Sequence, residues 1–201
     1  MDWMALIQST LILFAVVNPI GSIPIFLQLT HHLKPEGRQQ AFGTGVLTSI
    51  IILLIFILVG KSVLIHFFQI ELSDLMAAGG LLLLIIAIDH LVFGVLVKSV
   101  IKEEEQDAHH IGAVPIACPI LAGPGAMMTA FVTYSKFGFL VSAGSILIVF
   151  AITWVMLRFL DKIYSFLGKI VCLVLSKILC LFLAAIGIRL LMQGLTHYFI
   201  K

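Results

Sequence analysis

Residues 11–27 read LILFAVVNPIGSIPIFL, an apolar run that Asn18-Pro19-Ile20-Gly21 interrupts near its middle. Proline lacks an amide hydrogen and clashes with the preceding helical turn, and glycine weakens a helix interior. At an offset of 105 residues, Gly123-Pro124-Gly125 interrupts a second apolar run, residues 116–132. Inside a membrane, freed backbone groups are tolerated only where protein or a water-filled cavity satisfies them. Two such breaks in corresponding places predict discontinuous helices around a central binding site.

The composition is that of an integral membrane protein. Of the 201 residues, 61% are hydrophobic and 11% are charged, and the mean hydropathy is +1.19. Soluble domains carry roughly 25% charged residues. Because a membrane-spanning helix needs about 20 apolar residues, the length leaves room for about six or seven spans. We therefore expect an all-α integral membrane protein that forms a single transmembrane domain over residues 1–201.

The apolar runs divide into six predicted spans, of which the breaks make the first and fourth discontinuous. The spans cover residues 4–30, 39–60, 76–97, 113–135, 138–160 and 177–198. Basic residues gather after the first, third and fifth spans, at Lys34, Arg38, Lys98, Lys102, Arg158, Lys162, Lys169 and Lys177, against Lys61, Lys136 and Lys201 on the other side. Because positive loops face the cytoplasm, this distribution predicts both termini on the non-cytoplasmic side.

The two halves of the chain share an order of features. Residues 87–94 align with residues 187–194 at an offset of 100, as the two breaks align at 105. Each half has a broken span, a whole span, an interfacial segment (61–75 and 161–175) and a span with a charge near its middle. Three spans per repeat is an odd number, so the halves must insert with opposite topology. We predict a 3+3 inverted repeat of residues 1–97 and 113–201, joined by the loop 98–112.

The breaks carry the predicted binding site. Asparagine is a preferred N-cap and proline fits the first helical position, so Asn18-Pro19 is expected to start a second half-helix, with Ser22 and Pro24 as the alternative start. Gly123-Pro124 is expected to start another. Such ends expose free amide hydrogens and a positive dipole, which favour an anion such as the carboxylate of a small solute. Gly21 and Gly125 would let this ligand approach the backbone, and Thr129, one turn past the second break, is the side-chain candidate. The alternative is a pair of proline kinks without a ligand.

Asp89 and Arg189 are the charged residues near the middle of a span. A charge there costs at least ~2.5–3.5 kcal/mol and is functional by default, so we assign both to coupling or gating. Either they form a structural pair, or they line separate vestibules, because opposite span directions separate their depths by about 9 Å. Asp89 is also a candidate to bind a substrate amino group or a coupling ion, a proton or sodium.

The sequence lacks the motifs of an enzyme or an ATP-driven pump. It has no His-Glu-x-x-His and no Gly-x-Ser-x-Gly, and it has one central aspartate rather than two. The residues required for metallo-, serine or aspartyl proteolysis are therefore incomplete. The phosphate-binding loop of an ATP-driven pump is missing too. We expect no enzymatic activity, catalytic residue, metal site, cofactor or nucleic-acid partner. The alternative to a transporter is a channel for water or small solutes. Water channels also pair two half-helices headed by Asn-Pro, whereas the second break here is Gly-Pro-Gly.

Three motifs together resemble the MarC family of membrane proteins. They are residues 18–26 (NPIGSIPIF), 78–89 (AGGLLLLIIAID) and 114–126 (VPIACPILAGPGA), and the similarity runs over nearly the whole chain. The resemblance implies six transmembrane helices in a bacterial or archaeal cytoplasmic (inner) membrane. It also implies transport of small neutral amino acids of the glycine, alanine or serine class, in a family related to the LysE-type exporters. Both breaks match the motifs of the family directly. Arg189 does not match, because a neutral or acidic residue is usual at its position. Cys180 stands where glycine is common.

Overall fold

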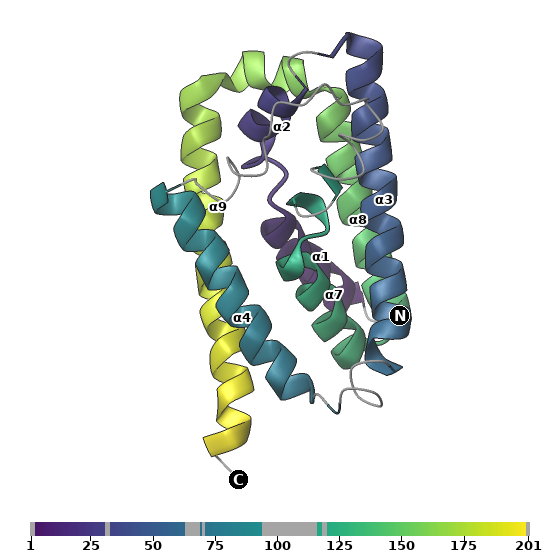
Figure 1. Cartoon of the computed structure of the whole chain (residues 1–201), viewed down its shortest axis with the longest axis vertical. Helices are drawn as coiled ribbons and strands as arrows, with labels where there is room; N and C mark the ends of the chain where they lie inside the picture. The colour runs from purple at the N-terminus through teal and green to yellow at the C-terminus, as the bar shows by residue number, and fades with distance from the viewer. Residues whose placement is uncertain are drawn as a thin grey trace.

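The computed structural model describes residues 3–30, 33–62, 69, 71–93, 116–117 and 120–199, and every element among them is helical. In chain order these are α1 (Trp3–Val17), α2 (Ile23–Leu29), α3 (Pro35–Ser62), α4 (Leu72–Ile88), a π-helical turn (Asp89–Phe93), α7 (Pro124–Phe137), α8 (Phe139–Arg158) and α9 (Leu160–Phe199). Figure 1 shows an elongated bundle with α4 and α9 on one side, α3 and α8 on the other, and α1 and α7 between them. The predicted loop 98–112 lies outside the described residues, and so do residues 63–68 and 70 of the predicted interfacial segment 61–75.

The described helices have the length and exposure of a membrane protein. Pro35–Gly60, Phe139–Arg158 and Leu173–Thr196 are long and apolar enough to cross a membrane, at 26, 20 and 24 residues, and Trp3–Val17 and Ser73–Ile88 are apolar but shorter. Large apolar side chains are exposed around the bundle, which is typical of a lipid-facing surface. The prediction of an all-helical integral membrane protein is therefore confirmed, while the six-span inverted repeat stays a prediction.

Helices α4 and α9 are antiparallel and pack with their backbones in contact (Figure 1). A Cβ atom on Gly80 would lie 2.5 Å from the Gly187 carbonyl oxygen and 2.8 Å from Leu191 Cα. A Cβ atom on Gly194 would lie 2.5 Å from the Ser73 carbonyl oxygen. Small residues allow this approach between helices in a membrane. The glycines therefore fix the register of the pair, with Gly80 opposite Gly187.

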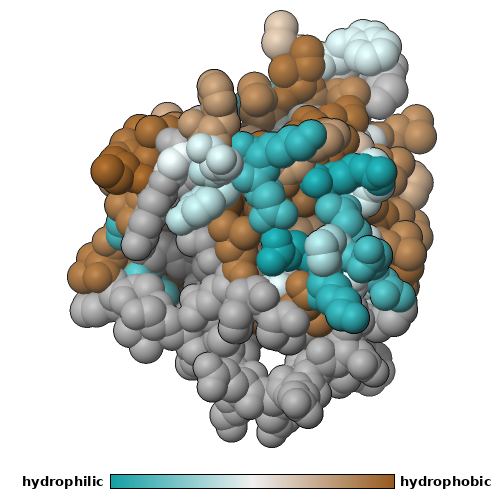
Figure 2. Space-filling model, turned by 90° about the horizontal axis from the view of Figure 1, so that it is seen from above, coloured by the Kyte–Doolittle hydropathy of each residue, from teal (hydrophilic) through white to brown (hydrophobic). Residues whose placement is uncertain are grey.

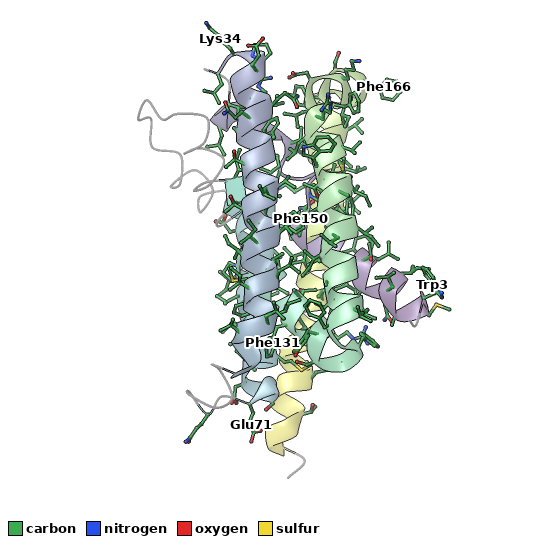
Figure 3. The ribbon with its side chains drawn as sticks, turned by 90° about the vertical axis from the view of Figure 1, so that its right-hand side faces the viewer. Trp3, Lys34, Glu71, Phe131, Phe150 and Phe166 are labelled. Atoms are coloured by element: carbon green, nitrogen blue, oxygen red, sulfur yellow. The ribbon has the colours of Figure 1, made fainter. Side chains whose placement is uncertain are left out.

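The other helices enclose the main apolar core. Phe26, Phe42 and Phe150 are fully buried there, and the rings of Phe26 in α2 and Phe42 in α3 meet edge to face with centroids 6.2 Å apart. Figure 3 shows Phe150 inside the bundle beside α3. The Ser142 hydroxyl of α8 donates to the Ala130 carbonyl of α7 at 2.9 Å. Helices α1, α2, α3, α7 and α8 thus form one packed body beside the α4–α9 pair.

The start of the second half-helix differs from the main prediction. Helix α2 begins at Ile23, with Ser22 at its N-cap, so the Ser22–Pro24 alternative is confirmed and the start at Asn18-Pro19 is wrong. The reason lies in the backbone of Asn18, whose φ of 48° is left-handed and incompatible with a helix start. The second break matches its prediction, because α7 begins at Pro124 with Gly123 at the N-cap.

The two ends of the bundle separate the charges much as expected. At one end Arg38 Nη1 of α3 lies 2.8 Å from Asp161 Oδ1 of α9, and Gln39 Nε2 donates to the Arg158 carbonyl at 3.2 Å. Lys136 marks the opposite end, where its Nζ lies 3.5 Å from Gln193 Oε1. The residues that follow the first and fifth predicted spans therefore meet at one end of the bundle, while the side of the membrane they face stays a prediction.

Helix α9 absorbs a segment predicted to be interfacial. It turns at Gly168 (φ 74°), and Figure 1 shows its first part crossing the top of the bundle before the rest descends beside α4. Lys177 was counted among the basic residues after the fifth span, although it is also the first residue of the predicted span 177–198. It lies within α9, and its Nζ donates to the Leu91 carbonyl at 2.5 Å. The antiparallel register explains the contact, because it places Lys177 beside the π-helical turn.

Candidate functional site

The two breaks lie against each other in the middle of the bundle. Gly125, the second residue of α7, faces α1 and α4: a Cβ atom on it would lie 3.3 Å from Val16 Cγ1 and would overlap Leu83. Val16 precedes Asn18 by only two residues. Figure 1 shows α2 leading upward from this level and α7 downward. The structure therefore brings together the two interruptions that lie more than a hundred residues apart in sequence.

The first break is held by a side chain that folds back on its own backbone. Asn18 Oδ1 accepts a hydrogen bond from the Gly21 amide at 3.0 Å. A Cβ atom on Gly21 would lie 2.6 Å from that oxygen and 2.7 Å from Asn18 Cγ. Asn18, Pro19 and Gly21 are all buried. Gly21 thus makes room for the Asn18 amide, and in this conformation protein fills the space that was expected to admit a ligand.

Cys180 of α9 also contacts the first break. Its Sγ lies 3.9 Å from Asn18 Nδ2, and the cysteine is buried. Sequence reasoning did not connect these residues, which are 162 positions apart. The sequence feature that could have indicated this contact is Cys180 itself, which stands at a position where glycine is common. The α4–α9 pair therefore contacts both breaks, through Cys180 at the first and Leu83 at the second.

The second break leaves amide hydrogens at the start of α7 without a partner in the described part of the chain. Gly123 is extended (φ −66°, ψ 171°), and the first amide to bond back to it is that of Met127, at 3.0 Å. Pro124 has no amide hydrogen, and no described residue accepts from the amides of Gly125 and Ala126. Helix α7 has 14 residues, so its N-terminus carries a full dipole. This end has the chemistry of an anion site.

Thr129 adds a buried hydroxyl to the same face of α7. It is 4% exposed, and its Oγ1 has no hydrogen-bond partner among the described residues. It follows Gly125 by one helical turn, so both lie on the face directed at α1 and α4. A buried hydroxyl without a partner costs about 1–3 kcal/mol. Such a cost is offset when a bound ligand supplies the missing hydrogen bond.

The structure does not bring Asp89 and Arg189 together. Asp89 is 7% exposed at the start of the π-helical turn, whereas Arg189 lies on the exposed side of α9. With Gly80 opposite Gly187, the two charges lie in opposite directions along the helix pair. A rise of 1.5 Å per residue separates them by about 16 Å. This placement favours separate charges over the structural pair.

The π-helical turn is a further feature that the sequence did not indicate. A π turn inserts one extra residue and disturbs the backbone hydrogen bonds next to it, often at functional sites. Here the turn starts at the buried Asp89, and Lys177 donates to the Leu91 carbonyl within it. The buried carboxylate of Asp89 and the ammonium group of Lys177 thus lie at neighbouring heights along the α4–α9 pair.

The comparisons with known proteins agree on one family. The family model described as MarC family integral membrane protein matches residues 3–199. A UPF0056 membrane protein of Archaeoglobus fulgidus is 32% identical over 92% of this chain and 89% of its own length. The UPF0056 membrane protein of Buchnera aphidicola subsp. Schizaphis graminum is 31% identical (98% and 95%), and UPF0056 membrane protein YhcE of Escherichia coli is 31% identical (93% and 90%). No solved structure matches.

Proposed function

Because the chain belongs to the MarC family of integral membrane proteins, we propose that it is a secondary transporter of small neutral amino acids in the cytoplasmic membrane. The observation that carries the proposal is the meeting of the two breaks at Gly125 and Val16. Discontinuous helices that meet midway through a bundle are the usual setting for substrate and ion sites in secondary transporters. A bilayer tolerates such irregular backbone only where protein or a cavity satisfies it.

The start of α7 would bind the carboxylate of the substrate. The free amides of Gly125 and Ala126 supply two hydrogen bonds, and the helix dipole adds a positive potential. The Thr129 hydroxyl, which has no partner in the described part of the chain, supplies a third. Leu83 and Val16 lie directly against Gly125 in this conformation, so the site would open by withdrawal of Leu83, and its apolar walls would suit a small neutral side chain.

Alternating access would come from movement between the two helical groups. Helix α4 contacts α9 more extensively than any other described pair of elements in the chain. Leu83 of α4 covers Gly125 at the second break, and Cys180 of α9 covers Asn18 at the first. A shift of the α4–α9 pair against the other body would therefore uncover both breaks together. Asp89, on the moving pair, would link this shift to a coupling proton or sodium ion.

Counterflow in proteoliposomes tests the proposal. The purified chain is reconstituted with unlabelled alanine inside, and the uptake of labelled alanine, glycine or serine is followed. A transporter gives saturable counterflow that depends on the internal substrate, whereas a channel gives unsaturated flux without counterflow. If none of the three amino acids moves, the proposed substrate class is wrong.

Three proline variants test the role of the breaks. We expect Pro19→Ala and Pro124→Ala to lose counterflow at least tenfold while the protein still inserts, because both prolines stand in the breaks. Pro35→Ala is the matched control, since Pro35 begins α3 away from both breaks. Near-normal counterflow in both break variants would refute the mechanism.

A further inference from the structure

A pocket lies at the end of the bundle where α3 begins, α8 ends and α9 begins. Its volume is about 490 Å³, and its lining residues are Gln39, Arg158, Phe159, Asp161 and Lys162. Small-molecule sites occupy roughly 300–1,000 Å³, so the pocket has the size of a binding site. Figure 2 looks onto this end and shows hydrophilic side chains gathered over it, with hydrophobic side chains around them. The pocket is separate from the two breaks.

Two cations at the pocket have no ionic partner among the residues that the structure describes. Arg38 Nη1 donates to both carboxylate oxygens of Asp161, at 2.8 and 3.0 Å, and so neutralises the acidic residue in the lining. Arg158 and Lys162 are exposed, and no described residue forms an ion pair with either of them. Gln39 holds the Arg158 backbone by donating to its carbonyl. The pocket therefore offers a guanidinium and an ammonium group to an anion.

Both cations lie over the faces of aromatic rings at the lipid-facing surface. The Arg158 guanidinium carbon lies 5.4 Å from the centre of the Trp154 ring, and Lys162 Nζ lies 5.6 Å from the centre of the Phe159 ring. The two rings are 42% and 45% exposed. Tryptophan and basic residues at the end of a membrane span are typical of the headgroup level. Figure 3 shows Phe166 at this same end, directed away from the bundle. The pocket therefore opens at the level expected for lipid headgroups.

We propose that this pocket binds the phosphate headgroup of an anionic phospholipid such as phosphatidylglycerol. Arg158 and Lys162 hold the phosphate, and Gln39 and the Arg38–Asp161 ion pair fix the wall behind it. The acyl chains continue along the exposed apolar side chains of α8, Ile148, Ile152 and Val155. A phosphate group binds arginine by paired hydrogen bonds and lysine as a point charge. The proposal is independent of what the protein transports.

Quenching of Trp154 by brominated lipids tests the proposal. The chain has two tryptophans, so Trp3→Phe leaves Trp154 as the single fluorescent reporter beside Arg158. The full chain is reconstituted in phosphatidylcholine vesicles with a small fraction of phosphatidylglycerol, and either lipid carries the bromine. We expect phosphatidylglycerol beside Trp154 to be enriched roughly tenfold over its mole fraction. Equal quenching by the two lipids at equal mole fraction would overturn the proposal.

Charge variants and a soluble competitor locate the site. Arg158→Gln/Lys162→Gln should abolish the enrichment, and Arg158→Lys/Lys162→Arg should restore most of it. Lys136→Gln removes a cation at the opposite end and should leave the enrichment unchanged. Enrichment that survives Arg158→Gln/Lys162→Gln would refute the assignment of these residues. Loss of the enrichment on adding inorganic phosphate or glycerol phosphate would also overturn it, because it would identify a site for a soluble phosphate.

Discussion

The first break predicts a strong coupling between Asn18 and Gly21. In Gly21→Ala the new methyl carbon would lie 2.6 Å from Asn18 Oδ1 and 2.7 Å from Asn18 Cγ. Both distances are shorter than non-bonded contacts allow. The Asn18 side chain must turn away, and the bond from the Gly21 amide is lost. A buried amide left unpaired costs about 1–3 kcal/mol. We expect a loss of this size in the free energy of unfolding, which corresponds to roughly 5- to 150-fold in the unfolding equilibrium.

The magnitude can be measured by unfolding the purified protein with dodecyl sulfate in mixed micelles. Gly43→Ala is the matched control, because a Cβ atom on Gly43 meets nothing within 4 Å. Alanine is a better helix former than glycine by about 0.8–1.0 kcal/mol, so this control should be neutral or stabilising. The two substitutions add the same methyl group, and they differ in what this group meets and in that Gly43 lies within helix α3 whereas Gly21 lies in the turn before α2.

A double-mutant cycle identifies Asn18 as the cause. Asn18→Gly removes the side chain that the methyl group would strike, and glycine accepts the left-handed φ of 48°. In the Asn18→Gly background, Gly21→Ala should therefore cost less than about 0.5 kcal/mol, which is the limit expected of uncoupled sites. A Gly21→Ala cost that is unchanged in this background, or as small as that of Gly43→Ala, would refute the reasoning.

Three further predictions address the other parts of the molecule. Thr129→Val should raise the KM for transport at least fivefold without loss of stability, because the hydroxyl has no partner to lose among the described residues; Thr153→Val, whose hydroxyl bonds its own helix at 2.8 Å, should leave KM unchanged. Gly80→Ala should destabilise the protein in dodecyl sulfate unfolding by at least about 1–3 kcal/mol, because the methyl group meets the α9 backbone, which cannot move aside. Lys177→Met removes a donor to the Leu91 carbonyl, and hydrogen exchange within residues 89–93 should accelerate at least fivefold; unchanged exchange would show that the bond does not stabilise the π-helical turn.

Local sequence was sufficient to predict the membrane class and the positions of both breaks. Proline and glycine act on the backbone wherever they stand, so an apolar run that contains them is interrupted without reference to its neighbours. The start of α7 at Pro124 followed from the same local rule. The start of α2 did not, because Asn18 and Ser22 are both good N-caps and their local signals are equivalent. The choice was made by the left-handed backbone of Asn18 and its bond to Gly21.

Contacts between helices could not be predicted in the same way. The register of α4 and α9 depends on which glycine faces which backbone, and the sequence contains several candidates on each helix. That register separates Asp89 from Arg189 and places Lys177 beside the π-helical turn. Lys177 stood at the boundary of the predicted span 177–198, where hydropathy does not indicate that a lysine within a span can bond a backbone carbonyl of the neighbouring helix.

The glycines of the two breaks show why local sequence rules could not predict the packing at the candidate site. A glycine beside a proline was read as space for a ligand, yet the Asn18 amide fills the space at Gly21 and Leu83 fills that at Gly125. Leu83 belongs to α4 and Cys180, the neighbour of Asn18, belongs to α9, so both breaks are covered by the same helix pair. Because α4 and α9 are joined backbone to backbone, neither can withdraw from its break alone. Under the proposed mechanism, a ligand that reaches Gly125 must displace Leu83 and with it the α4–α9 pair, whereas at Gly21 the Asn18 amide must move first.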